Sequence, residues 1–369
     1  MGGVSAGPLQ PLERIPRDLV AAADYERAAR AHVDDNAWAY LQGGAADELS
    51  VHDNAAAFRR LRLLPQPLNA VGHGQTQVEL FGETYAHPLV LAPVAYQRLF
   101  HAEGELATVQ GAGALDAAMT VSTLATTTLE AIAAQARAPL WFQLYWQGSR
   151  EASLALLRRA EAAGYKVLVL TVDAAVAGVR NREQRADFQL PAGIVPVNVD
   201  PAAALLPPGR DVFAGPMAQA PGWDDVAWLV RESRLPVVLK GLLHPLDARR
   251  AMDAGVHGIV VSNHGGRTLD TAAAPLEVIA AIRTVVGAGY PLLLDGGIRR
   301  GSDVFKAIAL GATAVMIGRP YIHALATAGA LGVAHLLRLL REELEITMAL
   351  CGCPSLAEIS DAYLLNPPE

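Results

Sequence analysis

The sequence predicts a barrel of eight parallel β-strands, each followed by a helix. Three observations favour this fold class. Short apolar runs alternate with amphipathic stretches from about residue 89 onward, the runs number eight, and polar residues gather at the carboxyl end of nearly every run. Runs rich in Val, Ile and Leu suit strands buried on both faces, and barrel enzymes build their sites at that end of the strands. A doubly wound open sheet is the alternative.

The apolar runs give the expected positions of the strands, and the stretches between them give helices. Apolar residues at helical spacing, ended by glycine, predict helices at 151–164, 245–255 and 302–311. The strands are expected within residues 89–93, 119–125, 140–145, 166–173, 235–241, 258–264, 291–297 and 314–320.

The segments outside this repeat are expected to serve the barrel. A helical region from Arg17 to Gln42 and a hairpin at 77–88 should pack onto it. We therefore expect a flexible leader at 1–16 and one domain at 17–369. The connection 191–221 is rich in Ala, Pro and Gly, and a long aperiodic loop of this kind predicts a lid over the barrel mouth.

Composition limits the possible partners. The chain has 369 residues, 52% of them apolar, and a net charge of -7. A mildly acidic chain argues against nucleic acid. We also expect no membrane partner, because no apolar run is seen to reach the roughly 18–20 residues that span a bilayer. Cys351 and Cys353 are too close for a relaxed disulfide and lack a metal-binding cluster, so we expect reduced thiols, no metal and a cytoplasmic location.

The stretch VSNHGGRTLD (261–270) carries the strongest chemical signal. An apolar run breaks there into a loop that holds a titratable imidazole, two glycines and a permanent cation. His264 can take a proton near neutral pH, and Arg267 can hold a carboxylate through two hydrogen bonds. The pattern predicts a base beside an anion clamp. A turn with solvated side chains is the alternative.

The last two strand ends predict an anion site. Glycines there let backbone N–H groups approach a phosphate, and arginines add charge. Glycine turns with surface arginines are the alternative. Lys240, at the end of the fifth strand, is costly to desolvate and could form a Schiff base or stabilise a developing anion. The predicted anion site comprises Asp295, Gly296, Gly297, Ile298, Arg299, Gly318 and Arg319.

Together these motifs resemble those of the FMN-dependent 2-hydroxy acid oxidase and dehydrogenase family, which includes glycolate oxidase, lactate oxidase and mandelate dehydrogenase. The resemblance runs from about Asp24 to Ile359. VAYQRLFH and QLYW are most similar to the hydroxymandelate oxidase branch. The matching motifs, in chain order, are LAPVAYQRLFHAEGE, WFQLYW, LTVD, VVLKG, VSNHGGRTLD, DGGIRRGSDVFKA and IGRP.

The resemblance implies an FMN cofactor on the strand ends. Backbone at Pro93, Val94 and Ala95 would contact the isoalloxazine, and Lys240 would favour its anionic reduced form. The other implied contacts are Ser122, Gln143 and Thr171 on the polar edge of the flavin, Ser262 along the ribityl chain, and Asp295 to Arg299 with Gly318 and Arg319 around ribityl and phosphate.

The resemblance also implies the substrate contacts. Arg267, Arg180 and Tyr25 would surround the carboxylate of a 2-hydroxy acid. Val179 stands where the family often has a second basic residue, which lowers the local charge.

The same resemblance implies the reacting groups. Tyr145 would contact the 2-hydroxyl, His264 would remove its proton, and Asp173 would stabilise the imidazolium. The Cα hydrogen would then pass to the flavin, as hydride or as a proton that leaves a carbanion.

Four positions bear on substrate and electron acceptor. Leu124 replaces a bulky Trp of glycolate oxidases, and Phe100 and Trp146 are expected to line a larger pocket, so we expect an aryl, medium-chain or lactate-type (S)-2-hydroxy acid. Ala95 accompanies oxidases, so O₂ is the expected acceptor and H₂O₂ a product. A dehydrogenase that uses a quinone is the alternative, and a flavin-dependent isomerase or non-catalytic flavoprotein is the alternative of another class. The family suggests a homotetramer.

Overall fold

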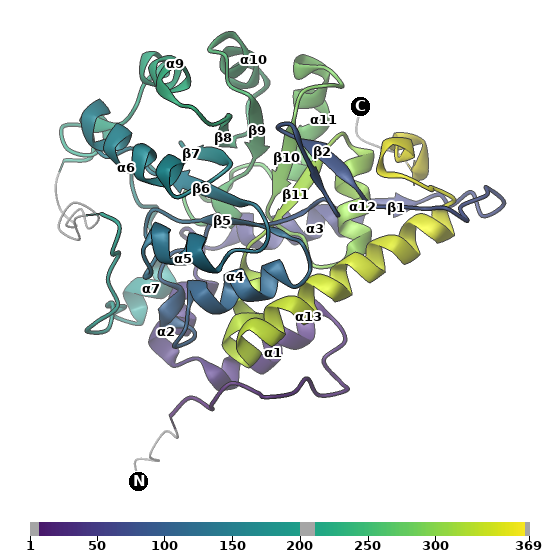
Figure 1. Cartoon of the computed structure of the whole chain (residues 1–369), viewed down its shortest axis with the longest axis horizontal. Coiled ribbons are helices and arrows are strands. Elements are labelled where there is room, and N and C mark those ends of the chain that lie inside the picture. Colours follow the sequence, from purple (N-terminus) through teal and green to yellow (C-terminus); the bar gives the residue numbers. More distant parts are fainter. Residues whose placement is uncertain (1–6, 200–210, 366–369) are drawn as a thin grey trace.

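The strands of the barrel lie within the predicted apolar runs or extend at most one residue beyond them. The computed structural model describes residues 7–199 and 211–365. Eight parallel strands form a closed barrel in the order β10-β11-β4-β5-β6-β7-β8-β9, which confirms the predicted fold and rejects the open sheet (Figure 1). The strands are β4 (Leu89–Leu91), β5 (Ala118–Val121), β6 (Leu140–Leu144), β7 (Val167–Thr171), β8 (Val237–Leu242), β9 (Gly258–Val261), β10 (Leu292–Asp295) and β11 (Ala314–Ile317).

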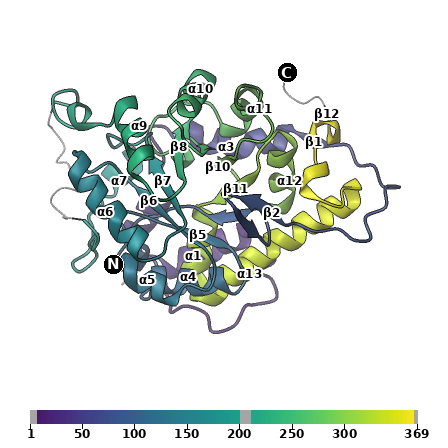
Figure 2. The same cartoon turned by 45° about the horizontal axis from the view of Figure 1, so that its top comes forward.

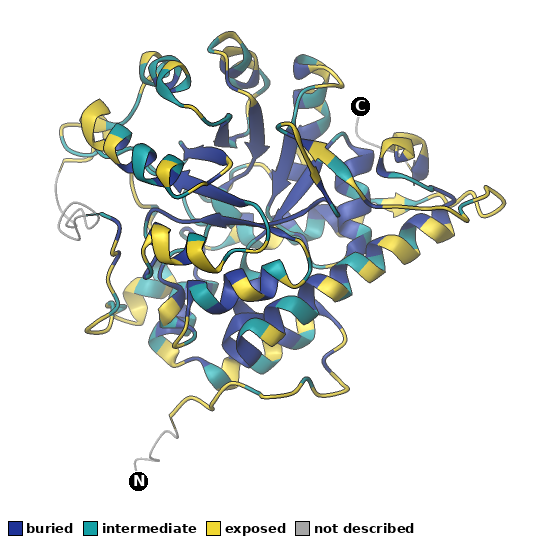
Figure 3. Ribbon diagram, in the orientation of Figure 1, coloured by how far each residue is buried: buried dark blue, intermediate teal, exposed yellow. Residues whose placement is uncertain are grey.

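Helices surround the barrel and bury one face each against it. Figure 3 shows dark blue strands inside and helices whose outer faces are yellow. A side chain caps the first turn of some of these helices: at α6, the Ser149 side chain accepts a hydrogen bond from Ala152 N. The surrounding helices are α4 (Glu105–Gly113), α5 (Leu129–Gln135), α6 (Arg150–Ala162), α9 (Trp223–Glu232), α10 (Pro245–Asp253), α11 (Pro275–Val286), α12 (Gly301–Ala309) and α13 (Arg319–Cys351).

The expected hairpin closes the amino end of the barrel. It consists of β2 (Val78–Leu80) and β3 (Glu83–Tyr85), paired antiparallel. The Phe81 ring meets the Trp141 ring edge-on at 5.5 Å, and Trp141 Nε1 donates to the Tyr85 hydroxyl over 3.0 Å. Since this end is filled with apolar side chains, only the carboxyl ends of the strands are left to form a polar site.

The N-terminal extension differs from its prediction. The expected helical region 17–42 is two helices, α1 (Ala22–His32) and α2 (Asp35–Gln42), because Asp34 caps a new helix by accepting from Ala37 N. Helix α3 (Leu49–Arg60) was not predicted: polar residues such as Asn54 interrupt its apolar spacing, yet Asn54 is buried. Helix α1 packs along α13 (Figures 1 and 2).

The remaining short elements lie outside the barrel strands. Strands β1 (Arg62–Leu63) and β12 (Leu364–Leu365) pair near the C-terminus. The short helix α7 (Asn181–Arg185) follows β7 and packs on α2. The 3₁₀ turns are η1 (Gln97–Leu99), η2 (Met217–Gln219), η3 (His264–Gly266), η4 (Leu356–Glu358) and η5 (Asp361–Tyr363).

Two predicted segments lie partly outside the described residues. Residues 1–6 of the expected leader are not described, but Leu9 N donates to Ala31 O and Leu12 N to Thr327 O, so the described part is tied to α1 and α13. Residues 200–210 of the expected lid are likewise not described. The lid stays a prediction.

Helix α13 corrects one expectation. Its length and composition would allow it to cross a membrane, contrary to the expectation that no apolar run reaches that length. However, 67% of the apolar stretch is buried inside the protein. The helix is also interrupted at Ala328 and Gly329, whose backbone is not helical. Length and composition therefore carry no membrane assignment here. Cys351 and Cys353 are both buried and free of a disulfide.

Candidate active site

A cavity opens at the carboxyl ends of the strands, and most of the predicted site residues line it. The predicted residues on its wall are Pro93, Val94, Tyr145, Thr171, Lys240, His264, Asp295, Gly296, Gly297, Ile298, Arg299, Gly318 and Arg319. The sequence analysis did not single out Val51, Asn54, Ala92, Gly265, Met316 and Pro320, which also line it.

A left-handed turn presents His264 to this cavity. Three successive residues have positive φ: His264 at 57°, Gly265 at 64° and Gly266 at 76°. Glycine adopts this backbone without strain, whereas histidine does so at a cost. At Gly266 a Cβ would stand 2.6 Å from Val51 N, so helix α3 packs directly on the turn. The two glycines let the chain reverse and fix the direction of the imidazole.

His264 is held between a carboxylate and a phenol. Its Nδ1 lies 2.8 Å from Asp173 Oδ1, and its Nε2 lies 3.4 Å from the Tyr145 hydroxyl. Because the carboxylate accepts from Nδ1–H, the neutral ring has Nε2 free to accept a proton. Burial by itself raises the pKa of Asp173, but His264 and Lys240 outweigh it and lower the pKa, so Asp173 stays charged. Burial raises the pKa of Tyr145, which therefore stays protonated.

Gly241 makes room for Asp173. Its φ is +111°, and a Cβ there would stand 2.4 Å from Asp173 Cγ. The residue sits at a shift of register between β8 and β9. Strand β8 therefore bulges next to Lys240, and the carboxylate of Asp173 occupies the space that a side chain would fill.

The two predicted carboxylate-binding arginines share one glutamate. Arg180 Nη1 and Arg267 Nη2 each lie 3.2 Å from Glu183 Oε1. Arg267 Nη1 also donates to the carbonyl oxygens of Tyr40 and Gly43, and its guanidinium stacks over the Tyr40 ring at 4.9 Å. Burial, and then the charge of Arg180, lowers the pKa of Arg267. The sequence analysis missed Glu183, whose only signal was its position three residues after Arg180.

The prediction that Tyr25 lies with these arginines is wrong. Tyr25 is completely buried, and its hydroxyl lies 2.8 Å from His335 Nδ1 on α13. Tyr40 contacts Arg267 instead. It stands near the end of α2, just before Gly43, and this closeness to a helix-ending glycine pair was the available signal.

Three further predicted residues surround the site without lining the cavity. Ser122 Oγ donates to Gln143 Oε1 over 3.3 Å. Leu124 follows β5, and its carbonyl oxygen accepts from Tyr96 N. Ala95 directly follows Val94 on the cavity wall.

Lys240 belongs to a buried polar cluster. Its Nζ lies 2.8 Å from Asp295 Oδ2 and donates to Ser262 Oγ over 3.0 Å, while Ser262 donates to Asp295. Burial alone would lower the pKa of Lys240, but Asp295 and Asp173 raise it. The amine is therefore a charged ammonium, which suits stabilisation of an anion and not formation of a Schiff base.

Four buried side-chain polar atoms lack a hydrogen-bond partner among the described residues: Thr120 Oγ1, Gln143 Nε2, Thr171 Oγ1 and Asp173 Oδ2. Two of them, the donor Gln143 Nε2 and the hydroxyl Thr171 Oγ1, lie near the carboxyl ends of β6 and β7. Gln143 is 1% exposed and Thr171 5% exposed. Since an unpaired buried polar group costs about 1–3 kcal/mol, such groups mark a place where a polar ligand edge fits.

Two partly buried arginines form the predicted anion site. Within the described ranges, neither Arg299 nor Arg319 forms an ion pair with a carboxylate; Arg319 donates to the carbonyl oxygens of Leu41, Gly265 and Gly43. Burial, with the charges of Arg267 and Arg299, lowers the pKa of Arg319 to about 9. Gly296 and Gly297 have φ of +104° and +88° beside them. The site offers positive charge and close backbone approach, as a phosphate requires.

Comparison with known proteins gives the class. The FMN-dependent dehydrogenase family matches residues 29–366, and the chain belongs to this family. It is 50% identical over 357 residues to an L-lactate oxidase of Alicycliphilus denitrificans, covering 95% of this chain and 98% of the relative. It is 46% identical to a 4-hydroxymandelate oxidase of Amycolatopsis orientalis, covering 91% and 95%. A crystal structure of mandelate oxidase with benzoyl-formic acid matches at a TM-score of 0.86 and 44% identity, covering 94% and 98%.

The residues present fit the family's cofactor, FMN. A flavin has a polar edge, which would pair with Gln143 Nε2 and Thr171 Oγ1, and a phosphate, which would pair with Arg299 and Arg319. The ammonium of Lys240 lines the same cavity. The three parts of the predicted cofactor site therefore occur in one cavity.

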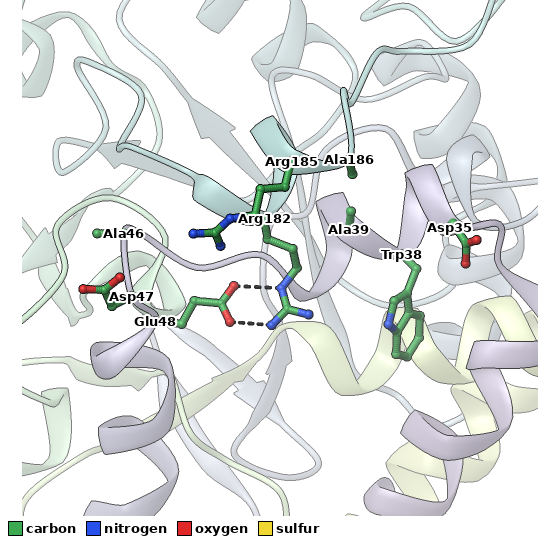
Figure 4. A pocket seen from close by; sticks show the side chains of 9 residues that line it. All are labelled: Asp35, Trp38, Ala39, Ala46, Asp47, Glu48, Arg182, Arg185 and Ala186. Atoms are coloured by element: carbon green, nitrogen blue, oxygen red, sulfur yellow. Dashed lines mark hydrogen bonds and ion pairs between the residues drawn. The ribbon is translucent and has the colours of Figure 1, made fainter.

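A second, more open hollow lies outside the barrel mouth between α2 and α7 (Figure 4). Arg182 pairs there with Glu48, and Trp38 stands at the other end. No predicted site residue lines it. In the described residues no group of His, Cys, Asp and Glu is placed to hold a metal ion.

Proposed function

We propose that this protein oxidises an (S)-2-hydroxy acid to the 2-oxo acid with FMN, and that O₂ reoxidises the flavin and yields H₂O₂. One observation carries the proposal. The Asp173–His264–Tyr145 set and the Arg180–Arg267 pair stand beside a cavity whose other wall fits FMN. The L-lactate and hydroxymandelate oxidases among the relatives support the same chemistry.

The arginines orient the substrate. Arg180 and Arg267 would take the carboxylate, which fixes C2 in one position relative to His264. Arg267 cannot swing away easily, because its Nη1 is held by the Tyr40 and Gly43 carbonyl oxygens.

His264 performs the proton transfer. Its Nε2 would take the proton of the 2-hydroxyl, to which the Tyr145 hydroxyl would donate a hydrogen bond. Asp173 keeps the proton on Nδ1 and stabilises the imidazolium that forms. FMN, when bound, supplies the acceptor for the two electrons and the hydrogen that leave Cα. Lys240 offers a positive charge near the cofactor site that favours an added negative charge.

The proposed substrates are aryl or medium-chain 2-hydroxy acids, with lactate included. Leu124 in place of a Trp leaves room beside C2, and Tyr40, stacked on Phe188 at 4.9 Å and facing Phe100 at 6.4 Å, adds aromatic surface near Arg267. The mandelate oxidase structures support the aryl class, and the L-lactate oxidases support the smaller acid.

We further propose a cytoplasmic homotetramer. The two buried, unpaired thiols support a reducing compartment, and the tetramer rests on the resemblance to the family. Light scattering of the purified protein tests the assembly, and a mass of one or two chains would reject the tetramer.

The function is tested by colour and oxygen uptake. Purified protein should be yellow, (S)-mandelate or L-lactate should bleach it without oxygen, and an oxygen electrode should then record uptake with formation of H₂O₂. Protein that takes up no FMN would reject the scheme. Reduced flavin that persists for minutes in air and reacts quickly with a quinone would make the protein a dehydrogenase. Faster turnover of glycolate than of mandelate and lactate would reject the substrate class.

A further inference from the structure

Glu183 pairs with both substrate arginines and has no part in the proposed reaction. Its Oε1 lies 3.2 Å from Arg180 Nη1 and 3.2 Å from Arg267 Nη2, and its Oε2 lies 3.4 Å from Arg180 Nη1. The three side chains are only 14–19% exposed. Water therefore screens their charges weakly.

The fold builds this contact from three segments. Glu183 comes from α7, Arg267 from the turn after β9, and Gly43 from the end of α2. A Cβ at Gly43 would stand 3.3 Å from Glu183 Oε1 and 2.8 Å from Ala39 O, so a glycine leaves the space that the carboxylate needs. Gly178 packs its backbone against Arg267, where a Cβ would meet the carbonyl oxygen at 2.7 Å. The glutamate is thus fixed by packing, and not only by charge.

The contact changes the charge that a ligand meets. Two guanidiniums without Glu183 would match a dianion, as Arg299 and Arg319 match a phosphate, which carries about −1.5 to −2. With Glu183 the cluster keeps one positive charge in excess, which matches one carboxylate. Glu183 also accepts from donors that a ligand carboxylate would otherwise use.

We propose that Glu183 sets the charge selectivity of the substrate pocket, so that it accepts 2-hydroxy and 2-oxo acids with a single negative charge and disfavours dianions. This inference rests on the proposed function, because it takes Arg180 and Arg267 as the carboxylate clamp. Glu183 is a positioning residue: it holds the two guanidiniums around one carboxylate and limits how strongly they bind another.

Two isosteric probes isolate the effect. Oxamate and oxalate have the same shape, but oxamate carries one negative charge and oxalate two. Glu183→Gln removes the charge of Glu183 and keeps a hydrogen-bond acceptor. Because the repulsion scales with ligand charge, a gain of about tenfold in oxamate affinity should accompany a gain of about a hundredfold for oxalate. Glu48→Gln is the matched control, since Glu48 pairs with Arg182 on the same helix outside the site.

The experiment is calorimetric titration of the FMN-loaded wild type and variants with each probe. We expect the ratio of oxamate to oxalate dissociation constants to rise about tenfold in Glu183→Gln and in Glu183→Ala, and to stay unchanged in Glu48→Gln and Glu183→Asp. If Glu183→Gln or Glu183→Ala folds and the ratio of the two dissociation constants is unchanged, the proposed role of Glu183 is overturned. Weaker binding of both probes would overturn it as well, and neither result would affect the proposed reaction. Wild-type holoenzyme that binds neither probe would also overturn the proposed carboxylate clamp.

Discussion

The two arginine pairs of the site differ in the groups that contact their charges. Arg180 and Arg267 share the carboxylate of Glu183, which leaves one positive charge in excess. Arg319, by contrast, donates to three backbone carbonyl oxygens, and neither it nor Arg299 has an ion-paired carboxylate in the described chain. All four arginines are partly buried, so the difference lies in their partners and not in their exposure.

The difference matches how long each ligand stays. A cofactor phosphate that remains bound can supply the missing negative charge itself, so two uncompensated guanidiniums give tight binding. A substrate and its product must leave in every cycle, and a partly neutralised pair binds a carboxylate less strongly. Carbonyl oxygens at the end of α2 serve both pairs, since Gly43 O accepts from Arg267 and from Arg319.

The largest effect should come from the base. His264→Ala should lower the rate of flavin bleaching by (S)-mandelate about 10²- to 10⁴-fold, because general base catalysis is lost. The variant should stay yellow, since His264 is on the substrate side. Anaerobic stopped-flow absorbance measures the rate, with His52→Ala as the exposed control. Bleaching at the wild-type rate would remove His264 from its proposed role.

The division between the two arginine pairs predicts a second effect. Arg319→Met should weaken FMN binding about 10- to 100-fold, because a charge-assisted contact of about 1.5–3 kcal/mol is lost. Arg267→Met should leave FMN affinity unchanged and raise KM for the hydroxy acid. Fluorescence titration with FMN measures the first quantity. Equal loss of FMN affinity in both variants would break the comparison.

Asp173 predicts a dependence of stability on pH. Its lowered pKa in the folded state means that its charge stabilises the fold above the ordinary aspartate pKa, and that this contribution is lost as the pH falls through the lowered value. Asp173→Asn should therefore reduce the free energy of unfolding by about 1–3 kcal/mol at pH 7. Urea unfolding should show that the difference in free energy of unfolding between wild type and Asp173→Asn becomes smaller below about pH 4. Asp53→Asn, an exposed change on α3, is the control. A difference in free energy of unfolding that grows in acid would contradict the lowered pKa of Asp173.

The smallest expected effect tests whether Tyr40, and not Tyr25, contributes to substrate binding beside Arg267. Tyr40→Phe should raise KM about three- to tenfold, because we expect the Tyr40 hydroxyl to donate a hydrogen bond to the substrate carboxylate beside Arg267, and such a bond is worth about 0.5–1.5 kcal/mol. Tyr25→Phe should leave KM within about twofold, since the Tyr25 hydroxyl bonds to His335. Steady-state oxygen uptake measures both. A larger change in Tyr25→Phe than in Tyr40→Phe would restore the original assignment.

The predictable part of the fold was local. Six strands lie inside their predicted runs, and β5 and β8 each extend one residue beyond theirs, because burial on both faces leaves a continuous apolar signal. Helix α3 was missed, since a polar residue in its sequence, Asn54, is buried by a reciprocal hydrogen-bonded pair with Asn263. A pair of this kind satisfies polar groups across 209 positions of sequence, and no local pattern reports it.

The sequence by itself determined the barrel, the glycine-containing turn at His264 and the chemistry of each strand end. These depend on neighbouring residues: apolar runs for burial and glycines for positive φ. Only the tertiary structure decided that Tyr40 and not Tyr25 meets Arg267, and that Glu183 lies between the two arginines. Those contacts arise where α2 and the segment after β7 pack on the barrel mouth, as when Arg267 reaches a carbonyl oxygen 227 positions away. The physical reason is that packing between distant segments selects which face of a helix meets the site, and helical spacing within one segment does not.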